Sequence, residues 1–278
     1  MKIQSWEVSD KFWAIVAPLV PKPERSLEKE YTRKVGGGRK PIDPRNVFAG
    51  IVYVLHTGIQ WKALPKVVFG SPSAIHRYFR EWERRGFFQE LWLRGLAEYN
   101  EMKGIAWRWQ AIDGSMNKAP LAREGSGANP TDRGKKGSKR HLLVDGRGVP
   151  LSIVVTGANR HDVSQLEAVL NVRVLSPLME NEEEHLCADA AYTGDEPRKK
   201  MIAAEYIPHV RSRGEEKYEK VIIPGFKARR WVVEACHSWL NRFRKLAIRY
   251  EKLNDTHIAL IHLAAAIIAL RKVGIIYG

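Results

Sequence analysis

Hydrophobic side chains recur every three or four positions over the first hundred residues, which is the pattern of amphipathic helices. The spacing predicts helices at about 9–19, 43–56, 72–85 and 87–100. Asp43 and Ser71 each precede a proline, and a capping residue followed by proline is typical of a helix start. The glycine-rich stretch 34–41, KVGGGRKP, predicts a loop or an arm.

From about residue 104 the pattern becomes that of strands. Apolar or β-branched runs at 107–113, 141–145 and 151–157 predict three antiparallel strands. There follow a helix at 162–170, a strand at 185–188, a helix at 196–205, a strand at 207–211 and two long helices at 229–246 and 255–273. This order predicts an all-α domain at 1–103, then an α/β domain at 104–278 with a mixed sheet flanked by helices.

The net charge of the chain indicates which kind of partner the protein binds. Among 278 residues there are 46 Lys and Arg against 31 Asp and Glu, a formal net charge of +15, while 44% of the residues are hydrophobic. Both predicted domains share the excess, which favours a polyanionic partner, nucleic acid first, over a generically basic protein. The longest apolar run, 258–270, is shorter than the roughly 20 residues needed to span a bilayer. With no secretory signal and two cysteines far apart, we expect a cytoplasmic, nucleoid-associated protein without a membrane partner.

Three carboxylates occupy positions that packing alone does not explain. Asp113 follows an apolar strand pattern, Asp189 follows the apolar run 185–188, and Glu234 lies on the predicted helix 229–246. A charged acid inside apolar sequence costs several kcal/mol unless something neutralises it. The alternatives are aspartates that cap turns at strand ends and a glutamate on a solvated helix face.

Four polar residues of the helix 229–246 share one face: Arg230, Glu234, His237 and Asn241. Because the apolar faces must pack on the sheet, we expect this polar stripe to face a cleft that also holds the two aspartates. Converging carboxylates with no nearby Cys or His pair suit Mg²⁺ or Mn²⁺ and disfavour zinc. Two such ions support in-line phosphoryl displacement, so the pattern predicts phosphodiester chemistry on nucleic acid.

Five ordered segments carry a family resemblance: AIDGS at 111–115, DRGKKGSKRHLLVDGRGVPL at 132–151, GANRHD at 157–162, DAAY at 189–192 and RRWVVEACHSWLNRFRKLAIRYEK at 229–252. Together they resemble the DDE transposases of bacterial insertion sequences, of the insertion-sequence-five family, over nearly the whole chain. The resemblance implies a ribonuclease-H-like fold. It also implies that Asp113, Asp189 and Glu234 are the metal-binding catalytic acids.

The resemblance is incomplete around the third acid. Arg230 matches the arginine of the family signature, but Lys227 stands where relatives carry tyrosine, and Asn241 stands where they carry lysine. We expect Arg230, His237 and Asn241 to support the active site. Glu234 lies 45 positions after Asp189, too few for a large inserted domain, so DNA must be gripped by the N-terminal domain, basic loops and a second subunit.

Basic residues are expected to contact DNA in both domains. In the N-terminal domain, helices 43–56 and 72–85 resemble a helix-turn-helix pair that would present Arg77, Arg80 and Arg84, and the arm would present Arg39 and Lys40 to a minor groove. In the catalytic domain we expect Arg133, Lys135, Lys136, Lys139, Arg140, Arg242, Lys245 and Arg249 to contact backbone phosphates. Simple packing of the helix 72–85, a plain flexible linker and a solvated helix face are the alternatives.

Taken together, the sequence predicts a DNA transposase that binds insertion-sequence ends and catalyses metal-dependent cleavage and strand transfer. Its partners would be double-stranded DNA, at the element ends and the target, and a second copy of the chain in an active homodimer. Two alternatives remain: a metal-dependent nuclease of the same fold, and a DNA-binding regulator with a decayed active site.

Overall fold

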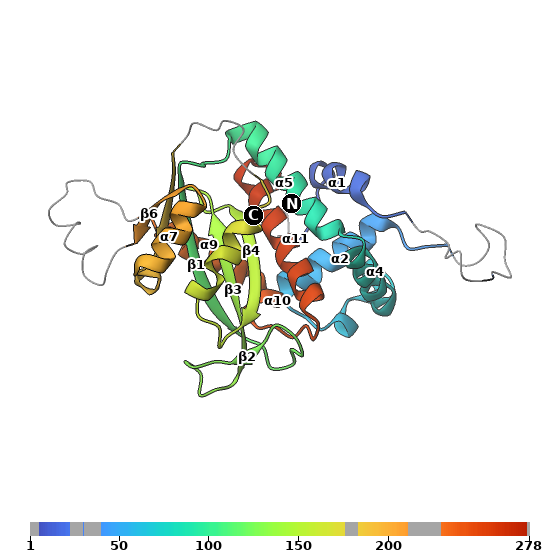
Figure 1. Ribbon diagram of the computed structural model, residues 1–278. Helices are drawn as coiled ribbons and strands as arrows, with labels where there is room; N and C mark the ends of the chain where they lie inside the picture. The colour runs from blue at the N-terminus through green and yellow to red at the C-terminus, as the bar shows by residue number, and fades with distance from the viewer. Residues whose placement is uncertain (1–5, 23–29, 31–39, 176–182, 211–228, 277–278) are drawn as a thin grey trace.

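The computed structural model describes residues 6–22, 30, 40–175, 183–210 and 229–276. Its first part is helical (Figure 1). The elements are α1 (Asp10–Val16), η1 (Ala17–Leu19), α2 (Pro44–Thr57), η2 (Trp61–Ala63), α3 (Lys66–Phe69), α4 (Pro72–Arg84) and α5 (Phe87–Lys103). The four predicted helices are confirmed, and the Asp43 side chain caps α2 by accepting a hydrogen bond from the Arg45 N–H. The short helices η2 and α3 occupy the connection between α2 and α4, so this pair is not joined by a simple turn.

The second part supplies the sheet and the helices that cover it. In chain order it contains β1 (Trp109–Lys118), β2 (Gly127–Ala128), β3 (Lys136–Val144), β4 (Pro150–Gly157), η3 (Val163–Gln165), α6 (Leu166–Asn171), β5 (Glu184–Ala188), η4 (Ala190–Tyr192), α7 (Asp195–Ala203), β6 (Tyr206–Val210), α9 (Trp231–Arg242), α10 (Arg244–Ala247) and α11 (Asn254–Lys272).

The sheet is mixed, with the long strands in the order β4-β3-β1-β5-β6. The pairs β1/β3 and β3/β4 are antiparallel, whereas β1/β5 and β5/β6 are parallel. An antiparallel meander continued by two parallel strands on the other side of β1 is the ribonuclease-H-like arrangement. The predicted fold class is therefore confirmed.

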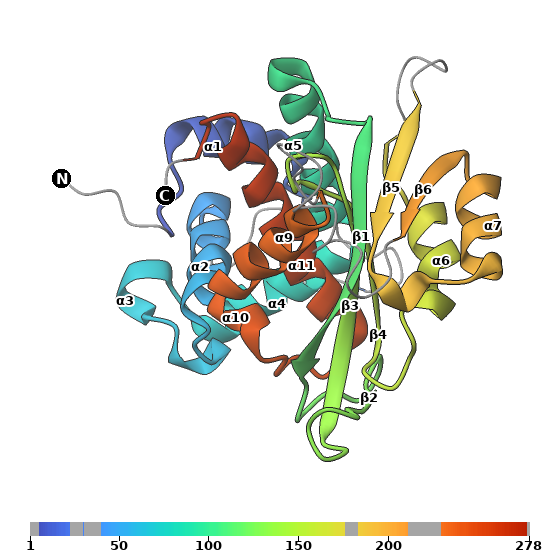
Figure 2. The same cartoon turned by 90° about the vertical axis from the view of Figure 1, so that its left-hand side faces the viewer.

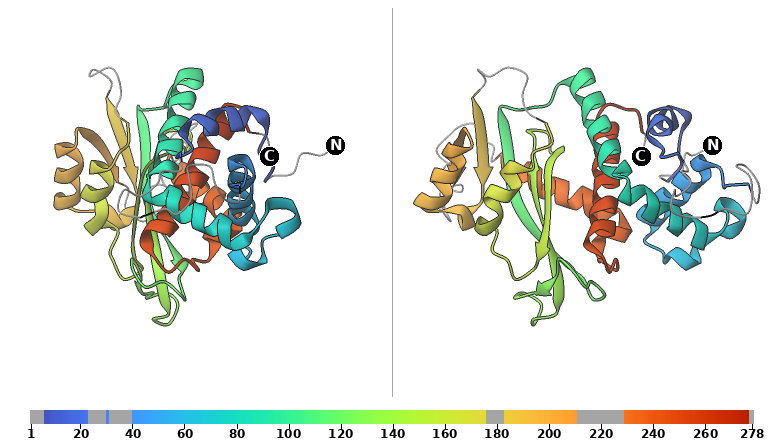
Figure 3. Two further views of the ribbon diagram at one scale, coloured as in Figure 1. Left: turned by 90° about the vertical axis from the view of Figure 1, so that its right-hand side faces the viewer. Right: turned by 45° about the vertical axis from the view of Figure 1, so that its right-hand side comes forward.

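Helices cover both faces of the sheet. Figure 2 shows α6 and α7 on one face and α9, α10 and α11 on the other, with the N-terminal helices packed beyond α11. The helix α5 runs against α11 (Figure 3). At their crossing Gly95 has no side chain, and a Cβ there would lie 3.3 Å from the Ala266 carbonyl oxygen. One hydrophobic core runs from Val8 to Leu270 through both parts of the chain, and the division into domains at residue 103 stays a prediction.

Two predicted elements differ from the structure in ways that concern the site. The first strand was expected to end at Asp113, but β1 continues to Lys118 because its polar second half pairs with the equally polar start of β3. The predicted helix 229–246 is broken at Phe243, whose backbone is extended (φ −76°, ψ 96°), and so becomes α9 and α10. None of the helices in the described ranges is long and apolar enough to cross a bilayer.

Candidate active site

Asp113 and Asp189 come from neighbouring parallel strands. The strands β1 and β5 are paired as far as Ala111 and Cys187, and each aspartate lies two residues further along. Asp189 directly follows β5 and caps η4, where its carboxylate accepts a hydrogen bond of 2.9 Å from the Ala191 N–H. The two carboxylates therefore stand at the same end of the two central strands.

Asp113 is an acid held largely away from water, with 22% of its side chain exposed. Burial raises its pKa to about 6, and the charges of Asp189, Asp162 and Glu234 add to this increase, although a backbone hydrogen bond opposes it. Four acids therefore share one electrostatic neighbourhood. A cation bound there would stabilise their ionised forms.

His237 of α9 is the residue that faces Asp113 from the helix. Its Nε2 lies 3.8 Å from the Asp113 Oδ2. Burial, together with the charge of Arg140, lowers the pKa of His237 to about 3. The imidazole is therefore neutral at physiological pH and does not neutralise the carboxylate.

Glu234 projects from the first turn of α9 and is exposed. Its carboxylate forms an ion pair with Arg230, four residues earlier. Within the described ranges, no three His, Cys, Asp or Glu side chains are grouped so that they could hold one metal ion. The three predicted acids share a neighbourhood, but their convergence on a common ion stays a prediction.

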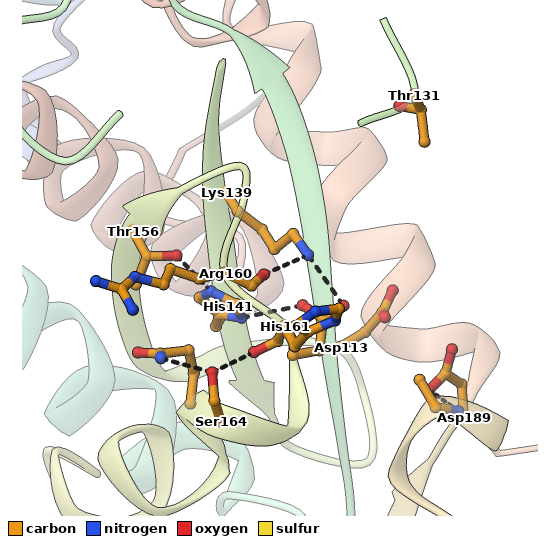
Figure 4. Close-up of polar contacts among 12 residues, drawn as sticks. Asp113, Thr131, Lys139, His141, Thr156, Arg160, His161, Ser164 and Asp189 are labelled. Atoms are coloured by element: carbon orange, nitrogen blue, oxygen red, sulfur yellow. Dashed lines mark hydrogen bonds and ion pairs between the residues drawn. The ribbon is translucent and has the colours of Figure 1, made fainter. Parts of the chain in front are cut away.

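On the far side of β1, the Asp162 carboxylate interacts with two side chains of β3, Lys139 and His141. Its Oδ2 accepts a hydrogen bond of 3.2 Å from the Lys139 Nζ, and its Oδ1 lies 3.2 Å from the His141 Nδ1. The other ring nitrogen of His141 lies 2.8 Å from the Thr156 hydroxyl. Figure 4 shows Asp113 between this network and Asp189. Burial tends to raise the pKa of Asp162, but the interactions with His141 and Lys139 outweigh it and lower the value.

Gly114 makes room for this network. A Cβ at Gly114 would collide with the Asp162 carboxylate and lie 3.1 Å from the His141 Nδ1. Sequence analysis did not single out this role of Gly114. The Asp162 side chain makes no capping hydrogen bond to η3, which follows it, and interacts with Lys139 and His141 instead. The signal in the sequence was the glycine directly after the strand aspartate.

Tyr192, the last residue of η4, is also buried beside the acids. Its hydroxyl has no hydrogen-bond partner among the described residues. Burial raises its pKa, and the charges of Asp162, Asp113 and Asp189 raise it further. The neutral phenol is a potential hydrogen-bond donor next to the carboxylates.

A cation–π contact and an aromatic stack attach the start of α9 to the sheet. The guanidinium of Arg229 lies 4.3 Å from the ring centroid of Trp109 on β1, and Trp109 stacks on His185 of β5 at 4.2 Å. Cation–π contacts of this kind are worth about 0.5–2 kcal/mol. They fix the end of the helix that carries Glu234.

Several residues predicted to contact DNA are buried. Lys139, Arg140, Lys245 and Arg249 are each at most 7% exposed. Lys139 binds Asp162, Lys245 lies 3.4 Å from the Glu251 Oε1, and Arg249 donates to the carbonyl oxygens of Glu124, Gly125 and Glu251. We correct the prediction for these four residues: their charges are enclosed by protein groups and do not offer a surface to a phosphate backbone.

The other predicted basic residues are better placed. Arg80 is half-buried, while seven residues are exposed: Lys40, Arg77, Arg84, Arg133, Lys135, Lys136 and Arg242. Lys136 begins β3, and its Nζ donates to the Ala122 carbonyl oxygen. Arg39 lies outside the described residues. DNA contact by these residues stays a prediction.

Arg140 and Asn241 form the second polar link between the sheet and α9. The guanidinium Nη2 of Arg140 donates a hydrogen bond of 2.7 Å to the Asn241 Oδ1. Arg140 is 1% exposed, whereas Asn241 lies at the surface. The link therefore runs from the interior of the protein to the exposed face of the helix that carries Glu234 and His237.

Two family descriptions match the chain. Residues 8–92 match the family described as "Putative transposase of IS4/5 family", and residues 109–269 match the family described as "Transposase DDE domain". The second match covers most of the sheet and the helices α6 to α11. It includes all three predicted acids.

Similar proteins come from insertion elements. The chain is 35% identical over 147 residues to the "Putative transposase for insertion sequence element IS402" of Burkholderia cepacia, which covers 51% of this chain and 67% of that protein. It is 29% identical over 137 residues to the "Putative transposase for insertion sequence element IS6501" of Brucella ovis, which covers 48% of this chain and 98% of that protein.

Solved structures with a partial likeness include the catalytic domain of Mos1 mariner transposase. It is 11% identical in sequence, with coverage of 72% of this chain and 96% of that chain and a TM-score of 0.30. The fold assignment accordingly rests on the strand order and directions described above.

Proposed function

This chain belongs to the transposase DDE domain family, and from that premise we propose that Asp113, Asp189 and Glu234 are its catalytic acids. The observation that carries the proposal is the electrostatic coupling of these residues, because Asp189 and Glu234 both help to raise the pKa of the buried Asp113. An enzyme tolerates such repulsion where a ligand relieves it. The shared electrostatic neighbourhood of the three acids supports this role.

The donor set suits a hard divalent cation, Mg²⁺ or Mn²⁺. Asp113, Asp189 and Glu234 would hold it, two ions being the expected number, through carboxylate oxygens without sulfur ligands. When bound, the ions supply Lewis acidity that activates the attacking oxygen and stabilises the leaving oxygen. Glu234 must leave Arg230 to take part.

The protein's own side chains hold the acids in place for this chemistry. Neutral His237 lies against Asp113 without neutralising it, and the cation–π contact at Arg229 fixes the start of the helix that carries Glu234. The Asp162 network supports β1 from the other face. These contacts keep two acids on the rigid sheet, while the third stands on a helix attached to it.

The proposed reaction has two phosphoryl transfers. In the first, the oxygen of water forms a bond to phosphorus at an element end, the bond to the 3′ oxygen breaks, and the 3′-OH takes up a proton. In the second, the oxygen of that 3′-OH forms a bond to the phosphorus of a target phosphodiester in the same in-line manner, the bond from this phosphorus to the target's 3′ oxygen breaks, and the released 3′ oxygen takes up the proton. Joining two ends requires two active sites, so we propose a homodimer on double-stranded DNA, acting in the cytoplasm at the nucleoid.

The test is metal-dependent cleavage of duplex DNA taken from the borders of the element. Wild type should cut in Mg²⁺ or Mn²⁺, and Asp113→Asn, Asp189→Asn and Glu234→Gln should each reduce the rate at least about a hundredfold. Asp195→Asn and Glu167→Gln are matched controls, because these exposed acids lie on α7 and α6. Full activity in any of the three active-site variants would refute the assignment of that residue.

A strand-transfer assay with a target plasmid separates the alternatives. A transposase joins the cut ends to the target, and a nuclease of the same fold cuts without joining. A regulator with a decayed site binds the ends and does neither. We expect joined products, in agreement with the family to which the chain belongs.

A further inference from the structure

Arg140 is a buried cation whose charge is not paired with an anion. Its side chain is 1% exposed, and within the described ranges no carboxylate forms an ion pair with it. Its Nη2 donates to Asn241, whereas its Nε and Nη1 have no hydrogen-bond partner there. Burial lowers the pKa of Arg140 to about 10, so the guanidinium is charged at neutral pH. A buried charge is unfavourable unless an opposite charge or several polar groups compensate it.

Two neighbouring strand residues also have buried polar atoms without a partner among the described residues. Ser138 lies two positions before Arg140 on β3, so both side chains point to the same face of the sheet, and the Ser138 hydroxyl is unpartnered. Asn117 of β1 is paired with Ser138 across the strands. The Asn117 Nδ2 donates to the carbonyl oxygens of Leu246 and Ala247, while its Oδ1 has no partner. These groups therefore face the layer between the sheet and the helices α9 to α11.

The helix α11 contributes His257 to this layer. Its imidazole is 1% exposed, and neither ring nitrogen has a hydrogen-bond partner in the part of the chain that the structure describes. Burial lowers the pKa of His257 well below its ordinary value, and the charges of Arg249 and Arg140 lower it further. The ring is therefore neutral, and one of its nitrogens carries a proton that it can donate. Arg140 and His257 thus belong to one electrostatic neighbourhood.

The unpartnered groups in this layer suit an anion. Donors outnumber acceptors, because Arg140 offers the N–H groups of Nε and Nη1, Ser138 offers its hydroxyl and His257 offers one ring N–H. Buried polar groups without a protein partner commonly bind an ordered water or an ion. Water would satisfy the donors and leave the guanidinium charge unpaired, whereas a small anion does both. Because these side chains are almost fully enclosed, a DNA phosphate does not reach them.

We propose that Arg140, Ser138 and His257 form a buried binding site for a small monovalent anion such as chloride. The anion accepts hydrogen bonds from the Arg140 Nε and Nη1, the Ser138 hydroxyl and the His257 ring. It neutralises the cation beneath α9 and so stabilises the packing of α9 and α11 on the sheet. The inference is independent of the proposed function, because the site uses none of the three acids.

The measurement is the thermal unfolding midpoint in EDTA and without DNA, at constant sodium concentration and ionic strength, while gluconate is replaced by chloride. We expect a saturable rise of about 3 °C in wild type, the order of shift that a ligand well above its Kd gives a protein of this size. Arg140→Met removes the charge and its donors and should abolish the rise. Ser138→Ala removes one donor and should need at least about threefold more chloride for half of the rise.

Two matched controls remove the same chemical groups from the surface. Arg84→Met and Ser73→Ala are both at exposed positions of α4, and each should keep the wild-type response to chloride. General effects of the two salts on the protein then cancel between each variant and its control. If Arg140→Met does not fold, the comparison of Ser138→Ala with Ser73→Ala decides the question, because Ser138→Ala removes a single hydroxyl.

Bromide locates the site directly, since it scatters X-rays anomalously. In crystals soaked with sodium bromide we expect an anomalous peak within hydrogen-bond reach of Arg140 and Ser138. The same chloride response in wild type and in the Arg140 and Ser138 variants would show that chloride acts elsewhere, and a missing bromide peak would show that water serves these donors. Either result would overturn the inference and leave the catalytic assignment intact, because the acids are tested by metal-dependent cleavage.

Discussion

Asp113 and Asp189 lie level with each other on adjacent parallel strands, each two residues beyond the last paired position of β1 and β5. The pairing of β1 with β5 fixes the main-chain positions from which both carboxylates project. Their repulsion, added to burial, raises the pKa of Asp113 to about 6. The protein therefore loses stability by keeping this site ready for a cation.

The first prediction concerns stability without metal. The folded state holds the Asp113 proton more tightly than the unfolded chain, where the pKa of aspartate is about 4. Stability should therefore fall as the pH rises from about 4 to about 6. In EDTA, Asp113→Asn should reduce this loss and be more stable at pH 7 by on the order of 2 kcal/mol in urea unfolding.

The control for this prediction is Asp195→Asn, at an exposed position on α7. Mg²⁺ should stabilise wild type and leave Asp113→Asn nearly unchanged, since binding to the folded state alone raises stability. If Asp113→Asn lowers the unfolding free energy in EDTA, then the ionised Asp113 carboxylate does not destabilise the folded protein.

The second prediction concerns the space beside Gly114. Gly114→Ala should cost about 1–3 kcal/mol in unfolding free energy, because the added methyl group displaces the Asp162 carboxylate from His141. In a double-mutant cycle with Asp162→Ala, the loss of unfolding free energy in the double variant should be smaller than the sum of the losses in the two single variants. Strict additivity would show that the methyl group is accommodated without moving Asp162.

The third prediction concerns acid sensitivity. His262 stacks on Trp92 at 5.0 Å, and burial lowers its pKa to about 4, below the unfolded value of about 6.5. The unfolded chain thus binds the proton more readily, and stability should fall as the pH drops from about 6.5 to about 4. His262→Phe should reduce that loss by on the order of 2 kcal/mol at pH 4, whereas His161→Phe, at an exposed position, should not.

The fourth prediction separates structural cations from DNA-contacting ones. Arg249 is fully buried and bonded to three carbonyl oxygens, so Arg249→Lys should lower the unfolding free energy by about 2–4 kcal/mol. It should not change the slope of log K against log salt for DNA binding. Arg84→Gln, at an exposed position of α4, should change that slope by about 0.9 with little loss of stability. A change in the salt slope for Arg249→Lys, without a loss of unfolding free energy, would show that Arg249 contacts DNA after all.

The sequence was sufficient to predict the order of helices and strands, since alternation and capping residues mark most of them. It could not show that β1 continues past Asp113, because the segment 114–118 is polar and becomes a strand only by pairing with β3. The same limit applies to Lys139 and Arg140. A basic residue is normally exposed, and only the completed fold shows that Arg140 is enclosed where α9 packs on the sheet and that Lys139 is enclosed against Arg160 and Asp162.

The site was predicted in its chemistry more than in its geometry. The motif resemblance selected Asp113, Asp189 and Glu234, and the structure adds the contacts that the spacing does not encode. Asp162 occupies the space left by Gly114, and Arg230 forms an ion pair with Glu234. Both are contacts that only the assembled fold can show.

The crossing of α5 and α11 also bears on how the chain is made. The face of α5 around Gly95 is covered by α11, which the ribosome synthesises after every other helix and strand of the described fold. The N-terminal helices of the nascent chain therefore keep apolar side chains uncovered until α11 has been translated. A chain that stops before α11 would expose this apolar face of α5 and would be prone to aggregation.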